Sequence, residues 1–257
     1  MWDRVILKAN ARQALSGGRY WTAYAACVIV SLITDIFGVG ERFVTQPDNP
    51  FTSYGTQSVE NWWDNVHFSW VWCPDLLVYI FVGLALTVGI SRFFVRNRFG
   101  ETKLETVFSG FQDNYMNTMG AMFTTRLFCV LWGILLIIPG IVKLLEYSMV
   151  KYILSDNPSM PGSRARQISG MMTNGEKGAI FVLYLSFLGW YILAMTAAAI
   201  LGWISWAASG ILSVAAASAV TAYQEATLAE LYIFLRDRAI QNGMVNPVEL
   251  GLVPPAA

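Results

Sequence analysis

The stretch LLIIPGIVKLLEYSM, residues 135–149, decides how this chain folds. A Pro-Gly pair, Pro139-Gly140, interrupts an apolar run at its centre. Proline removes a hydrogen bond from a helix interior, and glycine tolerates the geometry of a turn. The pair therefore predicts a turn between two apolar helices. We place these helices at residues 118–138 and 141–155.

The composition is typical of a protein that faces lipid. Of the 257 residues, 55% are hydrophobic and 13% are charged, with a mean hydropathy of +0.48. Soluble domains carry about 25% charged residues. This chain therefore has too few charges to cover a water-facing surface. Its formal net charge is zero, which gives no indication of nucleic-acid binding.

Six apolar stretches predict an all-α, polytopic transmembrane helical bundle. They lie at residues 20–38, 76–95, 118–138, 141–155, 179–201 and 208–234. A membrane span needs about 20 apolar residues. The fourth stretch is shorter than this, so the sequence leaves open whether it spans fully or forms a re-entrant or interfacial helix. No A-x-A-like site follows the first stretch, which is therefore expected to be a retained span.

The distribution of lysine and arginine predicts the orientation. Basic residues cluster at four places. Arg4, Lys8, Arg12 and Arg19 precede the first span, and Arg92, Arg96, Arg98 and Lys103 follow the second. Arg164, Arg166 and Lys177 precede the fifth span, and Arg236 and Arg238 follow the sixth. Cytoplasmic loops carry the excess of Lys and Arg. Both termini are therefore expected inside and the loop at 40–75 outside. Residues 118–155 must then form a hairpin with Pro139-Gly140 as its outer turn. A single Pro-kinked helix is the alternative, but it would place the basic 164–177 loop outside.

Three cytoplasmic segments have the spacing of interfacial amphipathic helices. Their apolar faces are Trp2, Val5, Ile6 and Ala9; Leu104, Val107, Phe108, Phe111 and Tyr115; and Ala165, Ile168 and Met172. Thr102 and Glu105 form a candidate capping box for the second. Basic amphipathic helices lie among anionic headgroups, although these faces could instead pack on the spans. Outside, the Trp-rich residues 58–72 predict an anchoring interfacial helix rather than a sugar or cofactor cage.

The same order of elements recurs three times. A Ser-Gly pair ends each cytoplasmic amphipathic segment, at Ser16, Ser109 and Ser169, and an apolar hairpin follows. The hairpins also end alike, in Phe93-Phe94-Val95, Tyr152-Ile153-Leu154 and Tyr232-Ile233-Phe234. We interpret this as a pseudo-threefold repeat over about 1–97, 98–157 and 158–238. The repeats make one transmembrane domain, 1–240, followed by a cytoplasmic tail, 241–257.

Several long motifs resemble a bacterial integral-membrane family catalogued as domain of unknown function 975. The matching residues are ALSGGRYW, LWGILLIIPGIVK, EYSMVKYILSDNPSM, ARQISGMMTNGEKGAIF and LSFLGWYIL, together with Tyr223. The tryptophan-rich outer loop and the Ala- and Ser-rich last span depart from the family. The resemblance implies a multi-pass protein of the bacterial plasma membrane. It carries no assigned activity, so no catalytic residue is transferred.

Enzyme and cofactor motifs are not found in the sequence. It contains no HExxH, GxSxG or glycine-rich phosphate loop, and the single histidine, His67, leaves no ligand set for zinc or haem. The cysteines Cys27, Cys73 and Cys129 lie far apart and imply no disulfide framework. We therefore expect a protein without enzymatic activity or cofactor. Its expected partners are the bilayer, anionic headgroups at the cytoplasmic face and another membrane protein; the oligomeric state is left open.

Charged residues within the apolar stretches form the candidate buried polar site. They are Arg126, Lys143, Glu146, Lys151, Glu225 and Glu230. A charge at bilayer depth costs about 2.5–3.5 kcal/mol on insertion scales, so such residues pair or face water. They are either interhelical pairs that fix the packing or a polar path, as in a small-solute or ion transporter. Lys143 and Glu146 have the spacing to pair on one helix. Similar depth predicts that Arg126 pairs with Glu225, with Glu146 as the competing partner.

Overall fold

The computed structural model describes residues 2–44, 77–112, 114–202 and 206–252, and these contain helices and no strands. The expected all-α fold is confirmed. The Trp-rich residues 58–72, Cys73 and nearly all of the 40–75 loop lie outside the described residues, so the expected outer helix is not tested.

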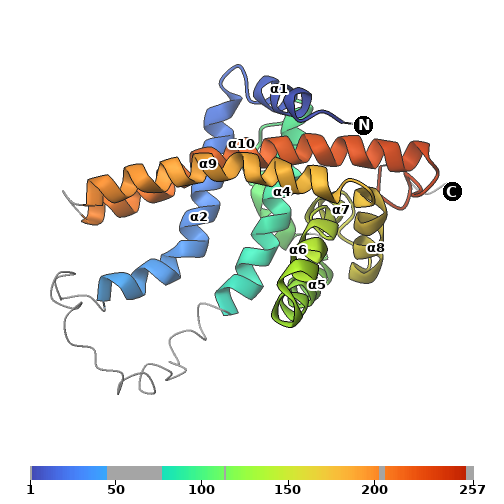
Figure 1. Ribbon diagram of the computed structural model, residues 1–257, viewed down its shortest axis with the longest axis horizontal. Helices are drawn as coiled ribbons and strands as arrows, with labels where there is room; N and C mark the ends of the chain where they lie inside the picture. The colour runs from blue at the N-terminus through green and yellow to red at the C-terminus, as the bar shows by residue number, and fades with distance from the viewer. Residues whose placement is uncertain (1, 45–76, 113, 203–205, 253–257) are drawn as a thin grey trace.

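Three pairs of helices diverge from a common centre (Figure 1). The pairs are α2 with α4, α5 with α6, and α9 with α10. In chain order, the elements are α1 (Arg4–Ala14), α2 (Arg19–Val44), a π-helical turn η2 (Tyr79–Gly83), α4 (Leu84–Arg98), a 3-10 helix η3 (Leu104–Phe111), α5 (Tyr115–Leu135), α6 (Ile137–Glu146), α7 (Val150–Asp156), α8 (Gly162–Thr173), α9 (Lys177–Gly202) and α10 (Trp206–Gln241).

Three helices of the described chain are long and apolar enough to cross a membrane. They cover Tyr79–Arg98, Tyr115–Leu135 and Lys177–Ile200. These segments coincide with the second, third and fifth predicted spans. The first and sixth predicted spans fall on α2 and α10. The structure does not describe the side chains at one end of each of these two helices. The fourth is divided between α6 and α7, and neither is long enough to cross alone.

The turn of the central hairpin was predicted at the wrong residues. Leu136, with φ −155° and ψ 128°, is the extended residue that separates α5 from α6. Pro139 and Gly140 instead lie inside α6. A proline in the first turn of a helix costs no hydrogen bond, because the first N–H groups have no intrahelical partner. The chain therefore reverses before the Pro-Gly pair rather than at it.

Gly140 has a different role, which is to let the two arms of the hairpin approach closely. A Cβ atom at Gly140 would lie 2.6 Å from the Cα atom of Gly133 on α5. Backbone contact of this kind requires small residues, as in closely packed membrane helices. The glycine that we predicted as a turn residue is thus a packing residue.

The N-terminal amphipathic helix forms, but with a different buried face. The Asp3 side chain accepts a hydrogen bond from the Val5 N–H and caps α1. Its buried residues are Leu7, Ala11 and Ala14, with Trp2 just before it. Val5 and Ile6, which we assigned to the apolar face, are 73% and 60% exposed. The face shifts because α1 packs against α10.

The second amphipathic segment is a 3-10 helix rather than an α-helix. Its N-cap is Lys103, and no side chain caps it, so the predicted Thr102–Glu105 capping box is wrong. The segment packs on α4 so closely that a Cβ at Gly89 would lie 1.8 Å from the Val107 carbonyl oxygen. The third segment, α8, buries Ala165, Ile168 and Met172 as expected. These two segments thus pack on the body of the protein, the alternative that the sequence left open.

The core lies where α4, α7 and α10 meet. Phe93 of α4, Tyr152 of α7 and Tyr232 of α10 are fully buried. The rings of Tyr152 and Tyr232 stack with centroids 5.3 Å apart. Arg92 donates a 2.7 Å hydrogen bond to the Ser155 carbonyl and joins α4 to the end of α7. Of the aromatic residues that end the hairpins in the sequence, Phe93, Phe94, Tyr152 and Tyr232 are therefore core residues, whereas Phe234 is 38% exposed.

The C-terminal segment up to residue 252 folds back onto the protein. Val245 and Leu250 are buried. Arg164 of α8 forms a 2.5 Å ion pair with Glu249, and Asn157 donates to the Glu249 carbonyl. The part of the predicted tail that the structure describes is therefore docked rather than free.

Candidate functional site

The six charged residues of the predicted polar site fall into separate clusters. Each of the three glutamates pairs with a cation, and each pair joins a different set of helices. Glu225 pairs with Lys151, Glu230 with Arg98, and Glu146 with both Lys143 and Lys177. The structure therefore does not bring the six residues together into one polar path.

The Glu225 cluster joins α7 to α10. Lys151 Nζ lies 2.6 Å and 2.7 Å from the two carboxylate oxygens, and the Tyr152 hydroxyl donates to the same carboxylate at 2.7 Å. The predicted Arg126–Glu225 pair is therefore wrong. Glu225 takes Lys151 because side chains of α7 contact α10 in the core, where the Tyr152 ring stacks on the Tyr232 ring.

Arg126 of α5 is exposed, and it forms no ion pair with any residue that the structure describes. Glu230 of α10 is only 6% exposed and lies 2.5 Å from Arg98 at the end of α4. The two glutamates of α10 thus tie that helix to α7 and to α4.

The Glu146 cluster lies at the end of α6. The predicted Lys143–Glu146 pair is confirmed, with Lys143 Nζ 2.8 Å from Oε1. Lys177, the first residue of α9, lies 2.7 Å from Oε2. The Ser169 hydroxyl of α8 donates to the Glu146 carbonyl at 2.6 Å. One glutamate therefore holds together the ends of three helices.

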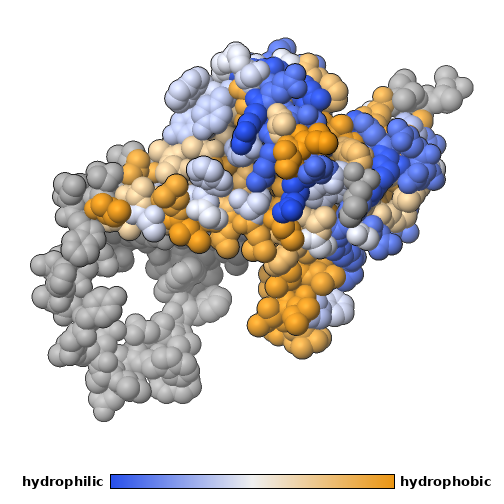
Figure 2. Space-filling view, turned by 45° about the horizontal axis from the view of Figure 1, so that its top comes forward, coloured by the Kyte–Doolittle hydropathy of each residue, from blue (hydrophilic) through white to orange (hydrophobic). Residues whose placement is uncertain are grey.

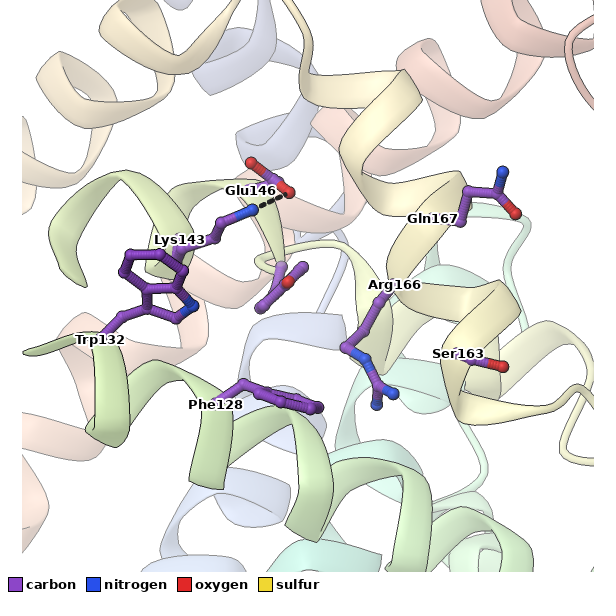
Figure 3. Close-up of a pocket in the computed structure, with 8 residues that line it drawn as sticks. Phe128, Trp132, Lys143, Glu146, Ser163, Arg166 and Gln167 are labelled. Carbon is purple, nitrogen blue, oxygen red and sulfur yellow. Dashed lines mark hydrogen bonds and ion pairs between the residues drawn. The ribbon is translucent and has the colours of Figure 1, made fainter. Parts of the chain in front are cut away.

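A pocket opens beside this cluster, between α5, α6 and α8 (Figure 3). Its volume is about 440 Å³. The lining residues combine aromatic, charged and polar groups: Phe128, Trp132, Lys143, Glu146, Tyr147, Ser163, Arg166 and Gln167. A hollow with an apolar wall and a few convergent polar groups is the usual form of a ligand site.

Arg166 is the main cation of this pocket. Its Nη1 donates to the hydroxyls of Thr124 at 2.9 Å and Thr125 at 3.3 Å. Its guanidinium carbon lies 5.1 Å from the centre of the Phe128 ring, within the range of a cation–π contact. All of these partners are neutral, so they hold the guanidinium in place without balancing its charge.

Sequence reasoning did not identify Arg166 as a site residue. The sequence nevertheless indicates a polar helix face that includes Arg166, because Ser163, Arg166 and Gln167 have the i, i+3, i+4 spacing of one face. Phe128 and Trp132 have the same i, i+4 relation on α5. The sequence did not show that these two faces are turned toward each other across the gap between α5 and α8.

A second polar cluster lies where α7 and α10 end. Asp156 accepts a 2.7 Å hydrogen bond from the Tyr232 hydroxyl and lies 3.3 Å from Arg236. These contacts join the end of α7 to α10, which is the geometry of a packing interaction.

In the part of the chain that the structure describes, these features define an all-helical fold with three helices long and apolar enough to span a membrane, and with a charged, aromatic pocket beside one of them. The family described as Protein of unknown function (DUF975) matches residues 74–239, and the chain belongs to this family. No curated protein and no solved structure matches the chain. The family is the one that the sequence motifs indicated.

Proposed function

We propose that the chain is an integral protein of a bacterial plasma membrane that acts through contacts with lipid or with a partner membrane protein, rather than through catalysis. The observation that carries the proposal is the large apolar surface of the α5–α6 hairpin. Its exposed residues include Leu127, Val130, Leu131, Ile134, Leu135, Leu136, Ile137, Ile138, Ile141 and Leu144. Figure 2 draws this surface as the orange projection at the lower edge of the molecule.

Helix α9 supports the same proposal. Apolar side chains are exposed along it: Phe181, Val182, Leu185, Leu188, Trp190, Ile192, Leu193, Met195 and Ile200. Monomeric soluble proteins rarely leave apolar patches of this extent uncovered. In a bilayer, lipid rather than water would contact these apolar side chains.

We further propose six membrane-embedded segments with both termini inside. The basic segments that support this orientation include α1, the end of α4 and α8. The fourth segment is then a broken one, α6 followed by α7, interrupted at residues 147–149. Broken helices are tolerated at membrane depth where other parts of the protein cover them, and α7 is buried in the core.

The threefold repeat is part of the proposal and is supported by where each amphipathic segment packs. Segment η3 packs on α4, the second helix of the first pair. Segment α8 packs where α6 meets α7, since the Ser169 hydroxyl also accepts from the Met149 N–H. Helix α1 packs on α10, the second helix of the third pair. Each segment thus contacts the second arm of the hairpin that precedes it, if the third hairpin is counted as preceding α1.

Accessibility of introduced cysteines tests the topology. The native cysteines are replaced, and Ser58 and Ser163 are each changed to cysteine. An impermeant thiol reagent is expected to label Ser58Cys from outside and to spare Ser163Cys. Labelling of Ser163Cys in intact cells would overturn the orientation.

A small-solute or ion transporter is the second candidate, favoured by the pocket beside Glu146. Flux across proteoliposomes distinguishes the two functions. Solute-dependent flux that Glu146→Gln abolishes would favour transport. A protein that carries no solute but retains lipid or a membrane partner during purification would support the first proposal.

A further inference from the structure

We propose that the pocket between α5, α6 and α8 binds the phosphate of an anionic phospholipid, whose acyl chains lie along the apolar surface of the α5–α6 hairpin. This inference rests on the membrane location proposed above and names the lipid class and the site.

The charge of the pocket selects an anion. Arg166 contacts two hydroxyls and a ring, and no carboxylate of the described chain lies within ion-pair distance of it. Glu146 is shared between Lys143 and Lys177. The pocket is thus lined by two cations, Lys143 and Arg166, and by one carboxylate that Lys177 also pairs with, which leaves an excess of positive charge. Arginine has five N–H donors in a planar fork that matches phosphate oxygens.

Further donors are found among the residues that line the pocket. Lys143 uses one of its three N–H groups on Glu146. The Gln167 Oε1 accepts from Arg164, which leaves its amide N–H groups as donors. Figure 3 shows Lys143 and Glu146 on one side of the pocket and Arg166, Ser163 and Gln167 on the other. A phosphate between them would meet charged and neutral donors together.

The apolar wall distinguishes a lipid from a soluble anion. Phe128 and Trp132 line the pocket and are partly exposed, and the apolar surface continues from them to the turn at Leu136. From Thr125, beside Arg166, to Leu136 the helix rises about 16 Å at 1.5 Å per residue. The hydrocarbon of one leaflet is about half of a 30 Å core, so the surface below the cation matches the length of an acyl chain, which inorganic phosphate would not use. A phosphate at this depth places the turn at Leu136 inside the bilayer, so the α5–α6 hairpin enters and leaves from the inner face.

Native mass spectrometry of the purified full-length protein tests the inference. The protein is delipidated in neutral detergent and titrated with dioleoyl phosphatidylglycerol or dioleoyl phosphatidylcholine. We expect one tightly bound phosphatidylglycerol, preferred over phosphatidylcholine. Arg166→Gln should weaken that binding by about tenfold, because it removes charge-assisted hydrogen bonds. Arg96→Gln, which removes an exposed arginine at the end of α4, is the matched control and should bind as the wild type.

Two further arms keep the outcome unambiguous. Arg166→Lys keeps the charge and should retain part of the preference, so it replaces Arg166→Gln if that variant does not fold. Inorganic phosphate is added as a competitor and should not displace the lipid at millimolar concentration. Equal binding of phosphatidylglycerol to wild type and Arg166→Gln would overturn the inference. Displacement by phosphate would overturn the lipid assignment in favour of a soluble anion.

Extraction of cell membranes separates this inference from the proposed function. If alkaline carbonate releases the protein without detergent, the membrane location itself is rejected. If the protein requires detergent and yet shows no preference for phosphatidylglycerol, only the lipid site is rejected.

Discussion

Lys151 of α7 and Glu225 of α10 form an ion pair with both carboxylate oxygens within 2.7 Å of the ammonium nitrogen. The Tyr152 hydroxyl donates to the same carboxylate. Both charged side chains are largely buried, with 15% and 14% exposed. The pair joins the second hairpin to the third, which is the role that we had predicted for Arg126 and Glu225.

The first prediction concerns this pair. Glu225→Gln should lower the free energy of unfolding by about 2–4 kcal/mol, because it leaves Lys151 buried without its counter-charge. Lys151→Gln should have a similar effect, and the double variant should be less damaging than the sum of the two. Thermal unfolding in detergent measures each variant. Arg126→Gln serves as the control, and coupling of Glu225 to Arg126 instead of Lys151 would contradict the structure.

The sequence was sufficient to predict the class of fold and the local charge pair. Apolar stretches of adequate length predicted helices at the right places, because helix formation depends on residues close in the sequence. Lys143 and Glu146 were correctly paired for the same reason, since three residues separate them on one helix. Buried residues of α8 also followed from spacing alone.

The pairs between helices could not be predicted in this way. The interpretation of Arg126 with Glu225 assumed straight, parallel spans and compared depths, whereas α6 ends at Glu146 and α7 begins only at Val150. That break carries Lys151 into the core beside α10. The wrong turn at Pro139-Gly140 has a related cause, because a proline is equally compatible with a turn and with the first turn of a helix.

The second prediction tests the corrected hairpin. Gly140→Ala should destabilise the protein by about 1–3 kcal/mol, because the added methyl group meets the backbone of Gly133 and the helices must separate. Gly133→Ala is the matched control, since a Cβ there meets nothing within 4 Å. Thermal unfolding of the two variants in the same detergent measures the difference. Equal stability of both would show that α5 and α6 do not cross at these glycines.

The third prediction concerns the contact of η3 with α4. The contact is reciprocal, since a Cβ at Gly110 would lie 2.2 Å from the Ala85 carbonyl oxygen and one at Gly89 would lie 1.8 Å from that of Val107. Gly89→Ala should therefore lower stability and yield of folded protein. Gly120→Ala, in an open position of α5, should be neutral or should stabilise by about 0.4–1 kcal/mol through the unfolded chain. Size-exclusion chromatography and thermal unfolding report both effects, and a tolerated Gly89→Ala would refute the close packing.

The last prediction concerns the docked C-terminal segment. The hydrogen bond from Arg164 lowers the pKa of Glu249 below its ordinary value of 4.5. Because the folded pKa is lowered, the stabilisation is present above pH 4.5 and is lost as the pH falls through the lowered pKa. Both side chains are about one-third exposed, so the contribution is small, about 0.2–1 kcal/mol. Residues 242–252 should then exchange amide hydrogens at most about fivefold faster in Glu249→Gln at neutral pH, after correction for intrinsic rates.

Acid should produce the same opening in the wild type and little further opening in Glu249→Gln, because that variant has no carboxylate left to protonate. Hydrogen exchange of the peptide that contains Leu250 measures both, with α8 as the internal reference. Val245 and Leu250 remain buried contacts of this segment in either state of Glu249. The segment should therefore loosen rather than detach. An acid response of equal size in both proteins would assign the pH dependence to other groups, of which Asp156, adjacent to the docked Gly251, is the nearest candidate.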